Sequence, residues 1–519
     1  MNTQSSQAPQ ACSQWANRIL ILSFIGIVYL TLFPFRLDFA APQSRTTSPF
    51  FLGPSLKHGD PVDFFLNLLL FIPFGFGFSA QLRKRGVSSG RIFALALAAG
   101  AVTSYCVEFL QFYIPTRSSA WDDVTPNTAG AVLGFLLFDR WGEVLLKPLS
   151  ALGERVEAWL SLRRASIFLL AYLAFFFLLS IPLQRETRLS NWDTTVPMFV
   201  GSDGTPRHAW KGQIAKLQVW NRAFSQELAR KIATGESAPD TDTGLVASYD
   251  FTGAPPYNDQ EKSLPPLAFI SSSAPRGSNV LDLNGSSWLS TKDRVTNLTV
   301  ALMRTNQFAV RAVCTPANVA DLEQHIVSIS HVYGTPDLYL RREQADLVFW
   351  FRNPLSAYRS LLAWHVRGVF ASGQTRDILV SYDGSNVSLY LDGKKDTRVY
   401  SLGPGAALAH KFMRVVAVDL HGYSVSYDVL IFLPAGLLLG MIARKDPSRK
   451  PAGRILLLLG FLLPSVFYEF ILVWVSGRAA SGWEIFLCLL LTLLGAWLIN
   501  ADRSDGILRD PLPPTLTVL

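Results

Sequence analysis

The polar side chains between Val107 and Gly130 have the types and the spacing that could bind a ligand or move a proton. The stretch VEFLQFYIPTRSSAWDDVTPNTAG lies between two apolar runs, and it contains Glu108, Gln111, Arg117, Asp122, Asp123 and Asn127. An ionisable group in a membrane helix costs about 2.5–3.5 kcal/mol at the bilayer centre and less near the interface. Such groups usually pair or line a cavity, so this stretch is the first candidate for a site.

Helical spacing brings some of these groups onto common faces. Glu108 and Gln111 are three positions apart and share one helix face. Asp123 and Asn127 are four apart, and they share a face if the next helix begins by Asp123. One more amide, Asn67, comes from an earlier apolar run.

A second arrangement of the same residues stays open. Thr125 can cap the helix with Pro126 at its first position, which leaves Asp122 and Asp123 in the preceding loop, still close to Glu108. In either arrangement Asn67, four residues after Asp63, supplies an amide from the other helix. Gly130 and Gly134 form a pair of small residues that lets helices pack closely.

The composition indicates a membrane protein. Of 519 residues 49% are hydrophobic and 17% are charged, and the mean hydropathy is +0.25, which is too apolar for an ordinary soluble domain. The net charge is +8, but the basic residues lie in short loops between apolar runs, so we expect no nucleic-acid binding. The four cysteines are far apart and show no metal-ligand spacing.

We predict a polytopic α-helical membrane bundle of about eight transmembrane helices in a 5 + 3 arrangement. A span takes about 20 apolar residues. The expected spans are 17–35, 62–80, 91–113, 124–139, 165–183, 424–443, 453–476 and 482–500, and the fourth of them is short.

Loop charge predicts the orientation of these spans. The loops 81–91, 140–164 and 444–454 contain fourteen Lys and Arg residues, and the opposite loops contain five. Basic loops stay on the cytoplasmic side. We therefore expect a multi-pass membrane protein with both termini in the cytoplasm. The polar stretch and residues 185–420 then lie outside the cytoplasm.

Residues 185–420 predict an all-β sandwich that interrupts the bundle. The segment DLYLRREQADLVFWFRN alternates apolar and polar residues, and ILVSYDGSNVSLYLDGKK alternates between two Asp-Gly turns. YDGSNVSLYLDGK and AWKGQIAKLQVWNRAFSQELARKI resemble the laminin-G/concanavalin-A-like jelly-roll family. The second motif usually follows the first, and here it comes earlier, which indicates a circular permutation.

The jelly-roll resemblance implies a glycan- or protein-binding outer domain that in some members holds Ca²⁺. We expect no other cofactor and no metal site. Asp203, Asp250 and Asp383 are expected to form turns rather than to act as ligands.

The membrane parts on the two sides of the sandwich resemble each other. DFFLNLLLFIPFGFGFSAQLRK aligns with SYDVLIFLPAGLLLGMIARK, and SYCVEFLQFYIPTRSSAW aligns with SVFYEFILVWVSGRAASGW. Glu108 precedes Arg117 by nine residues, as Glu469 precedes Arg478. This order indicates a duplication. Aligning Trp121 with Trp483 matches the two aspartates to Glu484 and Ile485, so the second copy keeps fewer polar groups.

The polar pattern of the first copy also resembles a known family. Asp63, Asn67 and Pro73-x-Gly75, then Glu108-x-x-Gln111, then Asp123-x-x-x-Asn127-x-x-Gly130 are similar to the VanZ-like family of bacterial membrane proteins. The likeness covers about residues 15–140 and, more weakly, 424–500. The family takes its name from a protein associated with teicoplanin resistance. The resemblance implies a small polytopic protein of a bacterial cytoplasmic (inner) membrane, without a defined reaction.

Three functions are compatible with the sequence. The first is non-enzymatic binding of a cell-envelope lipid, or of a lipid-linked glycan or polysaccharide, at the outer leaflet, with the sandwich holding the sugar or a protein. The second is a membrane-embedded enzyme that acts on lipid-linked glycans through Glu108 and Asp122 or Asp123. The third is an envelope scaffold in which the polar groups only lock helices together. The binding residues expected for the first are Asp63, Asn67, Glu108, Gln111, Arg117, Asp122, Asp123 and Asn127.

These expectations divide the chain into four parts. Residues 1–184 form the VanZ-like membrane domain with five spans, and 185–420 form the outer β-sandwich. Residues 421–500 form the degenerate repeat with three spans, and 501–519 form a cytoplasmic tail.

Overall fold

A computed structural model gives the fold. It describes residues 7–33, 35, 61–114, 117, 119, 121–236, 242–270, 280–317, 323–356, 362–396, 400–413, 420–445 and 451–500. The chain forms two compact units: Met1–Ala171 with Phe432–Phe461 and Leu491–Leu519, and Tyr172–Ile431 with Leu462–Leu490.

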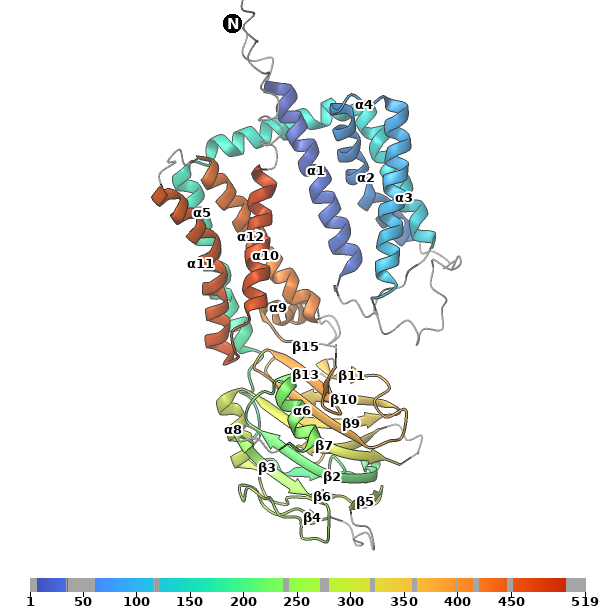
Figure 1. Ribbon diagram of the computed structural model, residues 1–519, viewed down its shortest axis with the longest axis vertical. Helices are drawn as coiled ribbons and strands as arrows, with labels where there is room; N and C mark the ends of the chain where they lie inside the picture. Colours follow the sequence, from blue (N-terminus) through green and yellow to red (C-terminus); the bar gives the residue numbers. More distant parts are fainter. Residues whose placement is uncertain are drawn as a thin grey trace, which may run out of the picture. The chain divides into compact units, whose positions relative to one another are not determined.

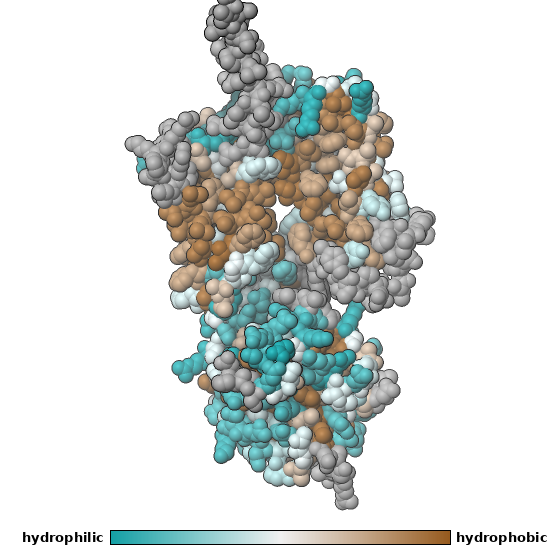
Figure 2. Space-filling view, in the orientation of Figure 1, coloured by the Kyte–Doolittle hydropathy of each residue, from teal (hydrophilic) through white to brown (hydrophobic). Residues whose placement is uncertain are grey.

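Among the residues that the structure describes, seven helices are long and apolar enough to cross a membrane, four before the β region and three after it (Figure 1). Their mean hydropathy values lie between 1.6 and 2.3. On the face that Figure 2 shows, hydrophobic side chains gather over the helices and hydrophilic ones over the strands. This is the surface of a multi-pass membrane protein with a water-exposed β region. The seven helices are α1 (Gln7–Leu32), α2 (Pro61–Lys84), α3 (Ser89–Gln111), α5 (Leu162–Arg185), α10 (Leu420–Lys445), α11 (Pro451–Ser476) and α12 (Gly482–Asn500).

The expected span 124–139 is helical but is not one of these seven. It forms the first part of α4 (Trp121–Trp159), a helix of 39 residues. Only about fifteen uncharged residues separate Asp123 from Asp139, and at 1.5 Å per residue they reach about 22 Å, less than the roughly 30 Å of a hydrocarbon core. After residue 139 the helix alternates charged residues with exposed apolar ones such as Trp141, Val144 and Leu152.

Glycines let α2 and α4 pack with their backbones in contact. A Cβ added at Gly75 would lie 2.0 Å from the carbonyl oxygen of Ala131, and one added at Gly134 would lie 2.2 Å from that of Ile72. Such distances leave no room for any side chain. Gly130 makes the same approach to the carbonyl of Leu68, at 2.3 Å. The small residues expected to pack helices therefore do so.

The same contacts recur between α10 and α12. A Cβ at Gly436 would lie 2.1 Å from the carbonyl oxygen of Thr492, and one at Gly495 would lie 2.2 Å from that of Leu433. Each of these four residues follows its counterpart in the first copy by 361 positions. Equal spacing at two independent contacts gives the duplication a geometric basis.

The β region is a sandwich of two antiparallel sheets. The seven-stranded sheet has the order β11-β10-β9-β8-β1-β6-β4, and the eight-stranded sheet has the order β14-β13-β12-β7-β2-β3, with β5 on β2 and β15 on β13. The strands are β1 (Met198–Val200), β2 (Lys211–Trp220), β3 (Leu245–Asp250), β4 (Ala268–Phe269), β5 (Leu281–Asn284), β6 (Leu289–Ser290), β7 (Phe308–Pro316), β8 (Gln324–Ile329), β9 (Leu338–Glu343), β10 (Asp346–Phe351), β11 (Trp364–Val366), β12 (Arg376–Tyr382), β13 (Asn386–Leu391), β14 (Lys394–Lys395) and β15 (Tyr400–Ser401).

Alternation along the strands places aromatic residues between the sheets. Phe308 of β7 contacts Phe351 of β10 and Tyr382 of β12, with ring centroids 5.3 and 5.5 Å apart. The Asp-Gly turns occur where the sequence predicts them, since Gly384 and Gly393 have φ values of 101° and 76°. The sandwich is confirmed, while its jelly-roll permutation stays a prediction.

Shorter helices lie within the β-containing unit. They are the 3₁₀ turn η3 (Pro206–His208) and the α-helices α6 (Gln226–Thr234), α8 (Thr296–Thr305) and α9 (Pro404–Met413). Asn306, directly after α8, donates from Nδ2 to the carbonyl oxygen of Ser476 at the end of α11, at 2.6 Å. Arg188 donates to the adjacent carbonyl of Val475, also at 2.6 Å. These bonds satisfy carbonyls that a helix end leaves without intrahelical partners.

The glycine contacts can be tested by adding one methyl group. We expect Gly75→Ala and Gly436→Ala each to destabilise the protein by about 1–3 kcal/mol, because the new Cβ overlaps a backbone carbonyl. Gly26→Ala is the matched control, since a Cβ at Gly26 in α1 meets nothing within 4 Å. The measurement is the thermal midpoint of the purified protein in detergent, and equal midpoints for all three variants would contradict the packing described.

Candidate functional site

Helices α3 and α4 bring the central polar residues into contact. Asn127 of α4 donates from Nδ2 to the hydroxyl oxygen of Ser104 on α3, at 2.9 Å. Both side chains are buried. The two helices run in opposite directions, so the next turn of each places Glu108 opposite Asp123. Glu108 is 2% exposed, which puts a carboxyl group inside the bundle.

Helix α2 adds its amide at the same level. Asn67 donates from Nδ2 to Oδ1 of Asp123, at 2.8 Å. The separation in sequence between Asn67 and Asp123 equals that between Gly75 and Ala131. The register that the glycine contact fixes between α2 and α4 therefore also brings Asn67 to Asp123. Asp123 and Asn127 share a face because α4 begins at Trp121, and the arrangement with Thr125 as the cap is wrong.

Two further polar residues attach the end of α1. Gln111 donates from Nε2 to the carbonyl oxygen of Thr31, at 2.9 Å. Arg117 donates to the carbonyl oxygens of Phe33 and Leu30, each at 2.9 Å. The last carbonyls of a helix have no intrahelical donors, so both side chains satisfy the end of α1. We call Asn67, Ser104, Glu108, Gln111, Arg117, Asp123 and Asn127 the polar cluster.

Two of the expected site residues lie at its edge. Asp63 is exposed in the first turn of α2, and Asp122 is half-buried in the first turn of α4. Acidic residues are favourable in the first turn of a helix because of its macrodipole. This placement explains both residues without a ligand.

The side-chain amide of Asn127 is incompletely satisfied. Its Oδ1 is buried and has no hydrogen-bond partner among the residues that the structure describes. A buried acceptor without a partner costs about 1–3 kcal/mol. Exchanging the assigned positions of oxygen and nitrogen would satisfy the oxygen and leave the nitrogen short of a partner instead. In both cases one polar atom at the centre of the cluster is left without a partner among the described residues.

The second copy fills the equivalent space with an ion-pair network. Arg478, which is 4% exposed, donates to Glu469 at 2.7 Å and also to Glu484. The backbone nitrogen of Ser481 donates to the other oxygen of Glu469, at 2.6 Å. The guanidinium group thus bridges two carboxylates.

This network corrects the alignment of the two aspartates. With the spacing of 361 fixed by the glycines, Glu469 corresponds to Glu108 and Glu484 corresponds to Asp123. Matching Trp121 with Trp483 shifted this part by one residue and was wrong. The second copy therefore keeps both acids, and it has Leu472 and Cys488 in place of Gln111 and Asn127.

The polar cluster lies in a segment of the chain that matches a known protein family. Residues 9–142 match the family VanZ/LLP1. This VanZ/LLP1 segment contains nearly all of α1, the whole of α2 and α3, and the first part of α4, and so the whole polar cluster. It covers about a quarter of a multi-pass membrane protein. No curated protein and no solved structure matches the chain.

The sandwich contains a group of residues that sequence reasoning missed. Asp203, His208 and His325 each place one potential metal-ligand atom within 4.8 Å of the others. Asp203 does form a turn with Thr205, as expected, and its second oxygen accepts from His208. His325 comes from a strand more than one hundred residues away, so no local spacing in the sequence could reveal the group.

The two equivalent arginines are expected to differ in their contribution to stability. Arg478→Met should destabilise the protein by about 3–5 kcal/mol, because it leaves two carboxylates without their bridging cation. Arg117→Met should cost about 1–2 kcal/mol, because it removes hydrogen bonds to neutral carbonyls. Thermal melts of the two variants in the same detergent measure the difference, and a larger loss for Arg117→Met would refute this assignment.

Proposed function

We propose that the VanZ/LLP1 segment binds the polar part of a membrane lipid or of a lipid-linked glycan at the outer leaflet, without catalysing a reaction. The unsatisfied amide of Asn127 carries this proposal. It is buried beside Ser104 and one helical turn from Asp123, and Glu108 comes from the facing helix. A single additional hydrogen bond from a ligand would satisfy it.

The charge of the polar cluster favours a ligand rich in hydrogen-bond donors. The carboxyl groups of Glu108 and Asp123 accept hydrogen bonds when ionised, and Asn127 presents an acceptor in its assigned orientation. Sugar hydroxyls or the ammonium group of a lipid head supply donors. A bare phosphate is disfavoured because it would bring a further negative charge beside two carboxyl groups. A glycan or an amine-bearing headgroup is therefore the ligand class that fits.

The proposed orientation puts this cluster on the outer side. Fourteen basic residues in three loops against five in the others favour cytoplasmic termini and eight crossings. The first part of α4 is shorter than a full span, and in this orientation it would complete the eighth crossing beside α2, against which it packs through Gly130 and Gly134. In Figure 1 the rest of α4 turns away from α2 and α3. Its exposed Trp141, Val144 and Leu152 lie at helical spacing, as in a helix at a membrane surface.

The second copy serves as the internal reference for this proposal. Its acids are bridged by Arg478, which supplies the charge that a donor ligand would bring to the first copy. A scaffold role is thus assigned to the second copy and a binding role to the first. A part in teicoplanin resistance or in envelope polysaccharide assembly would require the ligand to be a lipid-linked precursor.

Mass spectrometry of lipids that co-purify with the protein tests the proposal. We expect one class of amine-bearing lipid or lipid-linked glycan to be enriched in the wild type. Its amount per protein should fall about tenfold in Asn127→Ala and Glu108→Gln, the equivalent of losing one good hydrogen bond.

The control variant is Ser465→Ala in the second copy. Ser465 is the counterpart of Ser104, it is buried, and its hydroxyl has no partner among the described residues. This variant should retain the lipid. If the variants of the polar cluster melt at lower temperature and still carry the wild-type lipids, the cluster is a structural lock and the binding proposal is wrong.

A further inference from the structure

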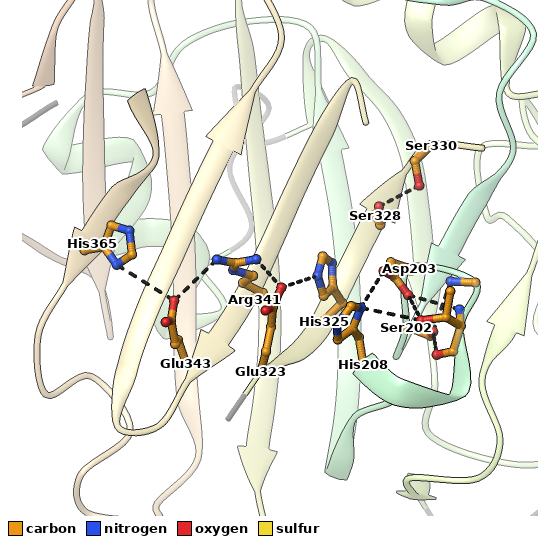
Figure 3. A network of polar contacts seen from close by, with 12 residues as sticks. Ser202, Asp203, His208, Glu323, His325, Ser328, Ser330, Arg341, Glu343 and His365 are labelled. Atoms are coloured by element: carbon orange, nitrogen blue, oxygen red, sulfur yellow. Dashed lines mark hydrogen bonds and ion pairs between the residues drawn. The ribbon is translucent and has the colours of Figure 1, made fainter. Parts of the chain in front are cut away.

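One face of the seven-stranded sheet bears a polar cavity. The inner face of β10 includes Phe349 and Phe351, which contact Phe308 of the other sheet. The opposite face therefore includes Val348, whose cross-strand partners are Arg341 on β9 and His365 on β11. Arg341 pairs in turn with His325 on β8. These residues form a row across the strands, which Figure 3 shows continuing to His208 and Asp203.

The cavity has a volume of about 510 Å³ and is lined by charged side chains from several segments of the chain. This is within the range of pockets that hold small ligands. Its lining includes Asp203, Arg207, His208, Glu323, His325 and Arg341. Two imidazoles and a carboxylate thus meet at the wall of an open space.

Three of these side chains have the geometry of a metal site. One ligand atom from each of Asp203, His208 and His325 lies within 4.8 Å of the other two. In a tetrahedral zinc site with bonds of about 2.0–2.1 Å, the ligand atoms are about 3.3 Å apart. Asp203 Oδ2 and His208 Nδ1 are already 2.7 Å apart, so small side-chain rotations suffice to enclose an ion.

His325 gives the second, independent indication. It is 5% exposed, and its Nδ1 has no hydrogen-bond partner within the described part of the chain. Its Nε2 lies 3.5 Å from a carboxylate oxygen of Glu323. A carboxylate on one ring nitrogen with the other nitrogen open is the arrangement that orients a metal-binding histidine. Glu323 is held in turn by Arg341.

We propose that Asp203, His208 and His325 bind one divalent ion of the zinc class, with a fourth coordination position open to the cavity. Imidazole ligands suit zinc and its neighbours, whereas calcium takes six to eight oxygen ligands. Three protein ligands beside an open space leave room for water or for an oxygen atom of a small ligand. The proposal is independent of lipid binding, because it involves only residues of the sandwich.

Titration of the full-length protein tests the site directly. The protein is purified in detergent without a histidine tag, dialysed against a chelator, and titrated with ZnCl₂ by calorimetry. We expect one saturable site. CoCl₂ should give the visible absorption of a four-coordinate Co²⁺, and CaCl₂ should neither bind there nor displace Zn²⁺.

Variants assign the binding to these residues. His208→Gln and Asp203→Asn remove ligands and should weaken Zn²⁺ binding more than Glu323→Gln. The latter changes no ligand but only a residue paired with His325 and Arg341, and it should cost about 10–100-fold. His365→Gln is the control, because His365 lies on the same face and outside the three-residue group. The thermal midpoint of each variant without metal is compared with that of the wild type, and only variants with the wild-type midpoint are interpreted.

The side chain of His208 is one-quarter exposed, so its substitution perturbs the core least. The proposal is overturned if the wild type shows no saturable Zn²⁺ site, if Ca²⁺ competes equally, or if His208→Gln binds Zn²⁺ as tightly as His365→Gln.

Discussion

The backbone contact between α2 and α4 is the constraint on which the first membrane copy depends. Lipid tails are as apolar as leucine, so no hydrophobic driving force pulls two membrane helices together, and close packing between small residues takes its place. Gly75, Gly130 and Gly134 let the backbones approach until carbonyl oxygens meet the opposite helix. This contact sets the register in which Asn67 reaches Asp123, and it therefore positions the polar cluster as well as stabilising the pair of helices.

Both copies use this helix contact, but their polar interiors differ. In the second copy Arg478 forms ion pairs with two acids within the protein. In the first copy the equivalent residue, Arg117, donates to carbonyl oxygens at the end of α1. The amides Gln111 and Asn127 stand where the second copy has a leucine and a cysteine. One copy thus pairs its acids with an internal cation and the other is richer in amides, which is the difference on which the proposal of a ligand in the first copy rests.

Much of this architecture could be predicted from the sequence because it depends on local patterns. Apolar runs identify the spans, alternation and Asp-Gly pairs identify the sandwich, and the spacing of Glu108 and Arg117 identifies the repeat.

The predictions failed where a sequence pattern was ambiguous or not local. The pair Trp121 and Trp483 suggested an alignment that was one residue out, because a bulky residue at a helix start is less constrained than a glycine inside a contact. The fourth span is limited by charges at both of its ends, which a count of apolar residues weighs too lightly.

The group around His325 could not be predicted, because strand pairing creates it. Asp203 and His208 precede β8 by more than one hundred residues, and only the antiparallel pairing of β1 with β8 brings the two segments together. His325 is buried there, and its Nδ1 has no partner among the residues that the structure describes. Asn127 is in a comparable situation in the membrane helices, since packing of α3 on α4 buries its amide and leaves one atom without a partner in the described part of the chain.

Several other buried polar atoms also lack partners within the described residues, including the ring nitrogens of Trp210 and Trp288 in the sandwich. An indole has one donor on a large apolar ring, so its burial has a sufficient explanation in packing. Asn127 and His325 are small and strongly polar, and each lies beside further carboxyl or imidazole groups, so packing alone does not account for them.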